Sequence, residues 1–210
     1  MSAAKTERLS RPLTLFFVRH AQAIHDPDEL DSSLSPLGHR QARSTANRLA
    51  TEHFDYAYVS SLRRARQTAE EILAPHVGIK RVITDDIQEV SRFHFSPAPA
   101  ASLEHFRSLM EAERDTLQRF ANRVRHEHRP GQRLLLVCHG NVIRTLIPLL
   151  SNRNPADSVL LEIYNASISI LDILPSGTGV VRLANSVEHL AADEITETAG
   201  QGLAAQPDTG

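Results

Sequence analysis

Short apolar runs alternate with longer amphipathic stretches along most of this chain. The first run, Leu13 to Val18, is rich in aromatic and β-branched residues and leads directly into Arg19 and His20. A run of this kind predicts a strand buried on both faces, which is typical of a parallel sheet. Three further apolar runs predict strands over residues 56–60, 80–84 and 133–138.

Amphipathic stretches follow these runs and predict helices between the strands. Ser35 and Pro36 supply an N-cap and a proline at the first helical position, and apolar residues then recur at helical spacing, so we expect a helix over about 36–52. Ser61 is expected to cap a helix that starts directly after the second strand. Two more helices are predicted, one from Leu103 to a stop at Gly131 and one from residue 140 onward.

The last part of the chain favours an antiparallel ending to the sheet. Two apolar stretches, 158–164 and 166–174, predict strands around a turn at Asn165. A third stretch, 180–184, follows a glycine-containing turn. The order of elements therefore predicts an α/β fold whose central sheet is mostly parallel.

Length and composition indicate one globular domain. A chain of 210 residues is long enough for one full core, and 41% hydrophobic with 23% charged residues excludes a disordered or fibrous protein. We expect the domain to span 12–191, between a flexible lead at 1–11 and a disordered tail at 192–210.

Charge and segment lengths exclude several classes of partner. A net charge of -2 gives no overall attraction to nucleic acid or to anionic membranes, so any anion must be recognised locally. No apolar run approaches the roughly 20 residues that span a bilayer, and the first ten residues lack the apolar core of a signal peptide. The single cysteine excludes an internal disulfide. We therefore expect a cytoplasmic protein without nucleic-acid or membrane partners.

Histidine and arginine recur where the predicted strands turn into helices. Arg19 and His20 end the first strand, Arg64 lies in the first turn of a helix, and His139 follows the most apolar strand. The carboxyl ends of parallel strands meet at one edge of a sheet, so these side chains should form one positive pocket. Helix N-termini add unpaired N–H groups there, and Asn141 at such a terminus is a further candidate phosphate ligand.

A phosphoryl group fits this pocket. Neighbouring arginines disfavour protonation of His20, which keeps a ring nitrogen available for in-line attack on phosphorus and predicts a phosphohistidine intermediate. Arg19, Arg64 and His139 would stabilise the transferring group without a metal or other cofactor. Glu89, after the third predicted strand, is the best placed proton donor for the leaving oxygen.

Four motifs carry a resemblance to a known family. They are VRHA at 18–21, SSLRRARQTA at 60–69, IQE at 87–89 and CHGNVIR at 138–144. In order and spacing they resemble the histidine phosphatase superfamily, which has the phosphoglycerate mutase-like fold, over about residues 13–185. The resemblance implies a three-layer α/β/α sandwich in which His20 becomes phosphorylated. It also implies that Arg19, Arg64 and His139 form the phosphate pocket and that Glu89 is the acid.

Further stretches, among them NASIS at 165–169, resemble the serine/threonine protein phosphatases of this family. Ala21 stands where the family most often has glycine, which narrows the backbone freedom of that turn. About fifty residues between Glu89 and Cys138 leave little room for the insert that covers the site in true mutases. We therefore expect a hydrolase with an open site, acting on a phosphoprotein or a small phosphomonoester. The same resemblance makes a homodimer an expectation and does not extend to a membrane anchor or a mitochondrial location.

Three alternatives use overlapping residues. Cys138 and Arg144 have the spacing of cysteine-dependent phosphatases, but Val137 stands where those enzymes usually have histidine. A second alternative is a protein that binds phosphorylated ligands without hydrolysing them. The third is a mutase that moves a phosphoryl group between positions of phosphoglycerate.

Overall fold

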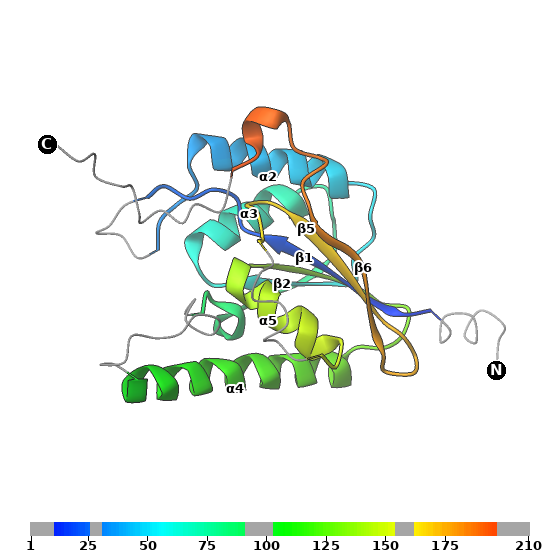
Figure 1. Ribbon diagram of the computed structural model, residues 1–210. Helices are drawn as coiled ribbons and strands as arrows, with labels where there is room; N and C mark the ends of the chain where they lie inside the picture. Colours follow the sequence, from blue (N-terminus) through cyan, green and yellow to red (C-terminus); the bar gives the residue numbers. More distant parts are fainter. Residues whose placement is uncertain (1–10, 26–30, 91–102, 154–161, 197–210) are drawn as a thin grey trace, which may run out of the picture.

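A six-stranded sheet forms the centre of the computed structural model (Figure 1), which describes residues 11–25, 31–90, 103–153 and 162–196. The strands are β1 (Leu13–Arg19), β2 (Tyr56–Ser60), β3 (Lys80–Thr84), β4 (Arg133–Cys138), β5 (Ile168–Ile173) and β6 (Gly179–Ser186). Their order across the sheet is β3-β2-β4-β1-β5-β6. The first four strands are parallel, and β5 runs antiparallel to both of its neighbours. This confirms the mostly parallel sheet with an antiparallel ending.

Helices cover both faces of the sheet and complete three layers (Figure 1). Helices α2 (Pro36–Leu49) and α3 (Arg63–Leu73) lie on one face. Helices α4 (Leu103–Glu127) and α5 (Gly140–Leu150) lie on the other. Two short 3-10 helices, η1 (Asp85–Ile87) and η5 (Ala192–Glu194), follow β3 and β6. The expected α/β/α sandwich is therefore confirmed.

Two apolar cores explain why the central strands are continuously hydrophobic. Along β1 and β4, Phe17 and Leu136 point into the core under α4 and α5. Their neighbours Phe16 and Leu135 point into the core on the side of α2 and α3. Successive side chains of a strand face opposite ways, so burial on both faces requires apolar residues at every position.

Two helix ends differ from the expectation. Helix α2 ends at Leu49 rather than at residue 52, because the chain turns back so that Phe54 can pack edge-on against Phe16 at 5.2 Å between ring centroids. Helix α4 ends at Glu127, before the Gly131 that was expected to end it. Both differences fall on end turns, where periodicity carries little information.

The predicted cap of α3 is wrong. Leu62 is the N-cap residue and makes no capping hydrogen bond through its side chain. The Ser61 hydroxyl instead donates to the carboxylate of Asp85, which follows β3. The Ser61 side chain therefore makes a tertiary hydrogen bond in place of the capping hydrogen bond that the local sequence predicted.

The C-terminal expectations are partly wrong. Most of the predicted strand 158–164 lies outside the described residues, and residues 162–164 are not in a strand. The predicted disorder from residue 192 is also wrong at its start, since η5 forms there and Glu194 is buried. Residues 197–210, like residues 1–10, lie outside the described part of the chain. Among the helices that the structure describes, none is long and apolar enough to cross a membrane.

Gly38 allows the first turn of α2 to approach the backbone of Gln22, in the segment that follows β1. A Cβ atom at this position would lie 2.0 Å from the Gln22 carbonyl oxygen, which is far inside van der Waals contact. Gly38→Ala is therefore expected to lower the free energy of unfolding by about 1–3 kcal/mol, against the gain of about 1 kcal/mol that the same change gives in an ordinary helix interior.

Urea unfolding measures this change. Arg43 is exposed on the same helix, so the free energy of unfolding of the control variant Arg43→Ala should stay within about 0.5 kcal/mol of wild type. A Gly38→Ala protein that is more stable than wild type would show that the turn has room for a side chain.

Candidate active site

The carboxyl ends of the parallel strands bring the predicted histidines together. His20 follows β1 and His139 follows β4, and their ring centroids are 5.0 Å apart at an interplanar angle of 59°. Arg64, in the first turn of α3, places its Nε 3.3 Å from His20 Nε2. The pairing of β1 with β4 in parallel register aligns Arg19 with Cys138 and so sets the two histidines side by side.

His20 is held in one orientation. Its backbone N–H donates to the Cys138 carbonyl at 2.8 Å, and its ring Nδ1 lies 2.7 Å from the Ala21 carbonyl. A carbonyl can only accept, so Nδ1 carries the proton and the lone pair of the neutral ring is on Nε2. Burial, followed by the charges of Arg19 and Arg64, lowers the pKa of His20 well below its usual value. Nε2 is therefore an available nucleophile.

His139 is completely buried beside His20. Its Nε2 lies 2.8 Å from the hydroxyl of Ser60, the last residue of β2, and its Nδ1 has no hydrogen-bond partner among the described residues. Burial, then His20 and the two arginines, lowers the pKa of His139 well below its usual value. Sequence reasoning missed Ser60, although its place at a carboxyl strand end was a usable signal.

Arg19 contributes a largely buried positive charge. Its guanidinium donates to the carbonyl oxygen of Ile163, which no sequence pattern indicated. Burial lowers the pKa of Arg19 to about 10, and the Glu89 carboxylate opposes that shift, so the group stays charged at neutral pH. Burial also lowers the pKa of Arg64, and the negative charges of Glu89 and Asp31 oppose that shift.

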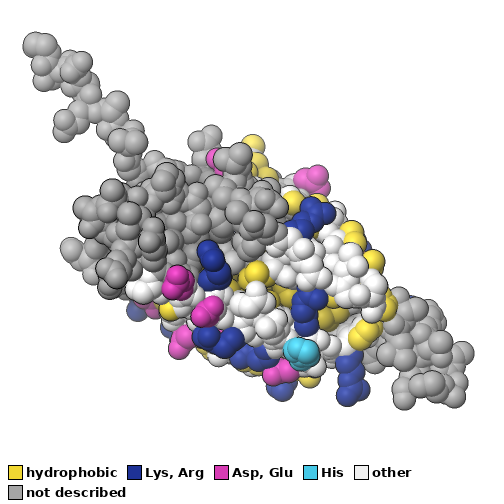
Figure 2. All heavy atoms as spheres, turned by 60° about the horizontal axis from the view of Figure 1, so that its bottom comes forward, with side chains coloured by type: hydrophobic (Ala, Val, Ile, Leu, Met, Phe, Trp, Pro, Cys, Tyr) yellow, Lys and Arg dark blue, Asp and Glu magenta, His cyan; other side chains and the backbone are white. Residues whose placement is uncertain are grey.

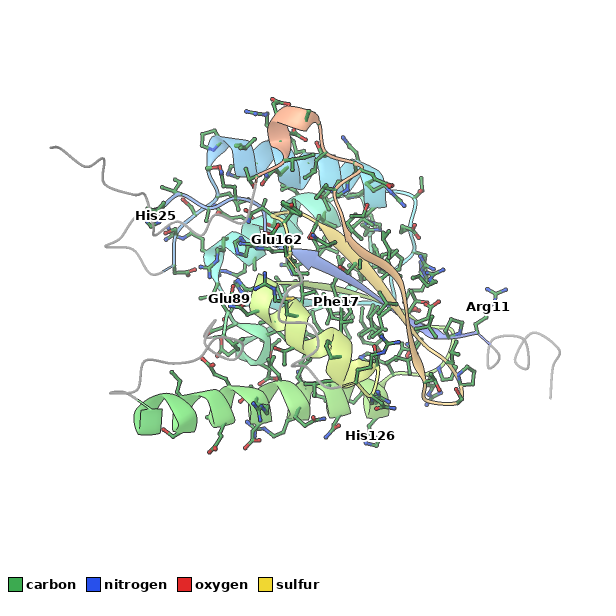
Figure 3. All side chains as sticks on the ribbon, viewed as in Figure 1. Arg11, Phe17, His25, Glu89, His126 and Glu162 are labelled. Carbon is green, nitrogen blue, oxygen red and sulfur yellow. The ribbon has the colours of Figure 1, made fainter. Side chains whose placement is uncertain are left out.

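Glu89 lies beside the first turn of α5 (Figure 3). Its Oε1 accepts the backbone N–H of Val90 at 3.2 Å and that of Asn141 at 3.3 Å. Desolvation by the surrounding protein raises the pKa of Glu89, while Arg19 and Arg64 act in the opposite direction. A carboxyl group with a raised pKa is suited to hold and release a proton.

Asn141 contacts the segment that carries this carboxyl group. Its side-chain amide donates to the Val90 carbonyl at 3.1 Å, and its Oδ1 accepts from Arg144 at 3.1 Å. These contacts give Asn141 a part in placing Glu89. Its expected role as a phosphate ligand stays a prediction.

The surroundings of the two histidines are positive, because Arg19 and Arg64 lower the pKa of both rings. The Glu89 carboxylate acts on Arg19, Arg64 and Arg144, while Asp31 also acts on Arg64 and Glu162 on Arg144. In contrast, basic and acidic side chains are interspersed on the face that α4 presents to solvent (Figure 2). Within the described residues, no group of three or more His, Cys, Asp or Glu side chains is arranged to hold a metal ion.

Cys138 is buried in the last position of β4, which disfavours the thiolate alternative. Burial raises the pKa of its thiol far above the ordinary value, and its backbone carbonyl accepts a hydrogen bond from the His20 N–H.

We expect the native thiol to resist an aromatic disulfide reagent and to react only on unfolding. We also expect Cys138→Ala to retain hydrolysis of p-nitrophenyl phosphate within about threefold. Loss of turnover in a Cys138→Ala protein of unchanged melting temperature would restore the thiolate mechanism.

Comparison with known proteins identifies a family and several relatives of this chain. The family model described as histidine phosphatase superfamily (branch 1) matches residues 15–186. The chain is 29% identical over 195 residues to the mitochondrial serine/threonine-protein phosphatase PGAM5 of Mus musculus, with 88% of this chain and 66% of that protein covered. It thus spans about two thirds of the length of that relative.

Two other similar proteins match over nearly their whole length. A broad-specificity phosphatase of Saccharomyces cerevisiae is 26% identical, with 87% of this chain and 90% of the relative covered. The crystal structure of phosphoglycerate mutase from Bacillus anthracis superposes with a TM-score of 0.68 at 21% identity, covering 87% of this chain and 97% of that one. The structural match shows a shared fold.

Proposed function

Because the chain belongs to the histidine phosphatase superfamily, we propose that it is a metal-independent phosphomonoester hydrolase that acts through a phosphohistidine on His20. The observation that carries this proposal is the state of the His20 ring. The ring is neutral, Nδ1 is committed to the Ala21 carbonyl, and Nε2 faces the Arg64 guanidinium at 3.3 Å. A phosphoryl group bound by that guanidinium would lie next to the nucleophilic lone pair.

In the first step, the Nε2 lone pair of His20 attacks phosphorus while the bond from phosphorus to the leaving oxygen breaks. Glu89 gives its proton to that oxygen, so an alcohol departs. Arg19 and Arg64 stabilise the charge on the phosphoryl oxygens, and the His139 Nδ1 is placed to contribute if it carries the ring proton. The Ala21 carbonyl stabilises the positive charge that the His20 ring gains.

In the second step, water attacks the phosphohistidine and the phosphorus–nitrogen bond breaks. The Glu89 carboxylate accepts a proton from that water and is thereby returned to its acid form. Inorganic phosphate leaves, and the electron pair of the broken bond returns to Nε2. The cycle regenerates the neutral His20 that the buried environment favours.

A phosphorylated protein or a small phosphomonoester is the proposed substrate. The similarity to a serine/threonine-protein phosphatase and to a broad-specificity phosphatase supports this range. Arg19, Arg64 and His139 are the residues proposed to bind the phosphoryl group, and residues 91–102, which follow Glu89 and Val90, lie outside the described part of the chain. A cytoplasmic location and a homodimer stay predictions.

The test is hydrolysis of p-nitrophenyl phosphate, a serine-phosphorylated peptide and phosphoserine, each with and without a chelator. We expect turnover that the chelator leaves unchanged. Turnover that requires added divalent metal would contradict the proposal. Phosphoryl exchange between positions of phosphoglycerate that depends on a bisphosphate primer would identify a mutase, and phosphate binding without any turnover would identify a binding protein.

A further inference from the structure

The peptide group between His20 and Ala21 is anchored at both of its polar atoms. The His20 carbonyl accepts from the side-chain amide of Asn165 at 3.1 Å and from the backbone N–H of Ala166 at 3.3 Å. The Ala21 N–H donates to the hydroxyl of Thr68 at 3.0 Å. The plane of the peptide that follows the nucleophile is therefore fixed from two sides.

The next peptide group, between Ala21 and Gln22, is anchored in the same way. Its carbonyl is the acceptor for His20 Nδ1, and its N–H donates to the side-chain oxygen of Gln41 at 2.8 Å. Gln41 lies in α2 and is fully buried. Rotation of this peptide would remove the acceptor that holds the His20 ring, so Gln41 acts on the nucleophile through the backbone.

One hydroxyl group joins the two amides that hold these peptides. The Gln41 amide donates to Thr196 at 3.2 Å and to the Glu194 carbonyl at 2.6 Å, and Thr196 donates to the Asn165 side-chain oxygen at 3.1 Å. An amide whose oxygen and nitrogen are both engaged cannot turn over without loss of hydrogen bonds. Thr196 thus shares the Gln41 amide with Glu194 and couples it to the amide of Asn165, although it lies 176 positions after His20 in the chain.

Residues 189 and 190, a few positions before Thr196, also pack against the turn that follows His20. Leu190 shares a buried apolar cluster with Ala21, Ala42 and Ala166. The neighbouring His189 contacts the Ala166 carbonyl at 3.2 Å. Ala166 has a φ of 57°, a left-handed conformation that costs energy in a residue with a side chain and persists only where the surroundings enforce it.

We propose that Thr196 is a positioning residue for His20, acting through Gln41 and Asn165, and that residues 189–196 support the turn that carries His20. This inference rests on the proposed role of His20 as the nucleophile. Thr196 touches no reacting atom. Its effect is to keep the Ala21 carbonyl in place, and hence to keep the proton on Nδ1 and the lone pair of His20 on Nε2.

The test compares matched variants of the full chain in the hydrolysis of p-nitrophenyl phosphate. Thr196→Val removes the hydroxyl and keeps the shape, and we expect kcat to fall about tenfold or more with KM within twofold, because misplacing a reacting group slows the reaction more than it weakens binding. Thr196→Ser keeps the hydroxyl and should stay within twofold of wild type. Ser44→Ala removes a 2.8 Å hydrogen bond to Glu194 in the same segment and should leave kcat unchanged.

Two results would overturn the inference. One is a Thr196→Val protein that keeps its kcat. The other is equal loss of kcat in Thr196→Val and Ser44→Ala, in proportion to their melting temperatures, which would reduce Thr196 to a structural role.

A spectroscopic measurement separates this inference from the proposed function. Two-bond proton–nitrogen NMR spectra of the imidazole rings should show His20 as the Nδ1–H tautomer in wild type and as a mixture of tautomers in Thr196→Val. An unchanged tautomer in Thr196→Val would refute the inference whether or not the protein hydrolyses phosphate. Full hydrolysis by His20→Ala would refute the proposed function, and a changed tautomer in Thr196→Val would then show only that Thr196 orients the His20 ring.

Discussion

His20→Ala is expected to reduce phosphomonoester hydrolysis by about 10³-fold or more, the largest effect of any single substitution at the site. The change removes the ring nitrogen that faces Arg64, and a water molecule in the space left behind could not form the covalent intermediate. Steady-state hydrolysis of p-nitrophenyl phosphate measures the loss.

The stability of a protein-bound phosphoryl label in acid and in alkali identifies the chemistry of the intermediate. Wild type quenched during turnover of a radiolabelled phosphoprotein should carry label that survives alkali and is released by acid, as expected of a phosphoramidate. His20→Ala should carry none, while His128→Ala, which alters a buried histidine hydrogen-bonded to Tyr58 in the middle of β2, should be labelled normally. Label retained in His20→Ala would place the nucleophile elsewhere.

Glu89→Gln is expected to lower kcat by roughly 10²–10⁴-fold for a phosphoserine peptide, because the alcohol leaving group needs a proton as it departs. For p-nitrophenyl phosphate the first step should lose much less, since nitrophenolate leaves without protonation. A burst of nitrophenol followed by slow turnover is therefore the expected pattern. Equal losses with the two substrates in burst measurements would show that Glu89 is not the acid.

The same variant tests the pH dependence. Activity needs neutral His20, whose pKa is lowered, and protonated Glu89, whose pKa is raised. The rate of the first step should therefore rise as pH increases through the lowered histidine pKa and fall as pH increases through the raised carboxyl pKa. Glu89→Gln should lose the falling limb and keep the rising one. A falling limb that survives in Glu89→Gln would assign it to another group.

The central sheet and most of the site could be predicted because they depend on local pattern. β1 and β4 are buried on both faces, so their uninterrupted apolar runs identify them, and His20 and His139 follow as the first polar residues after each run. Arg64 was predictable because a strand and a helix meet within a few residues of it. Parallel pairing then brings these ends to one edge without any further information.

Contacts between distant segments could not be predicted from pattern. Ser60 and Ser61 are equivalent in the sequence, yet one contacts His139 and the other Asp85, and only the packing of β2 between β3 and β4 separates them. Thr196 lies in a polar stretch whose composition indicates disorder, and a single hydroxyl in the right place has no compositional signature. Hydrogen-bond partners of this kind are specified by the fold as a whole.

The position of β1 in the sheet also determines when the site can form during synthesis. Its two partners are β4, which starts at Arg133, and β5, which starts at Ile168. The most apolar segment of the N-terminal half therefore has no strand to pair with until most of the chain has left the ribosome. Long-range pairing of this kind slows folding and leaves hydrophobic surface exposed to other chains in the meantime. Assembly of the catalytic edge is therefore expected late in folding, after β4 and β5 have been synthesised.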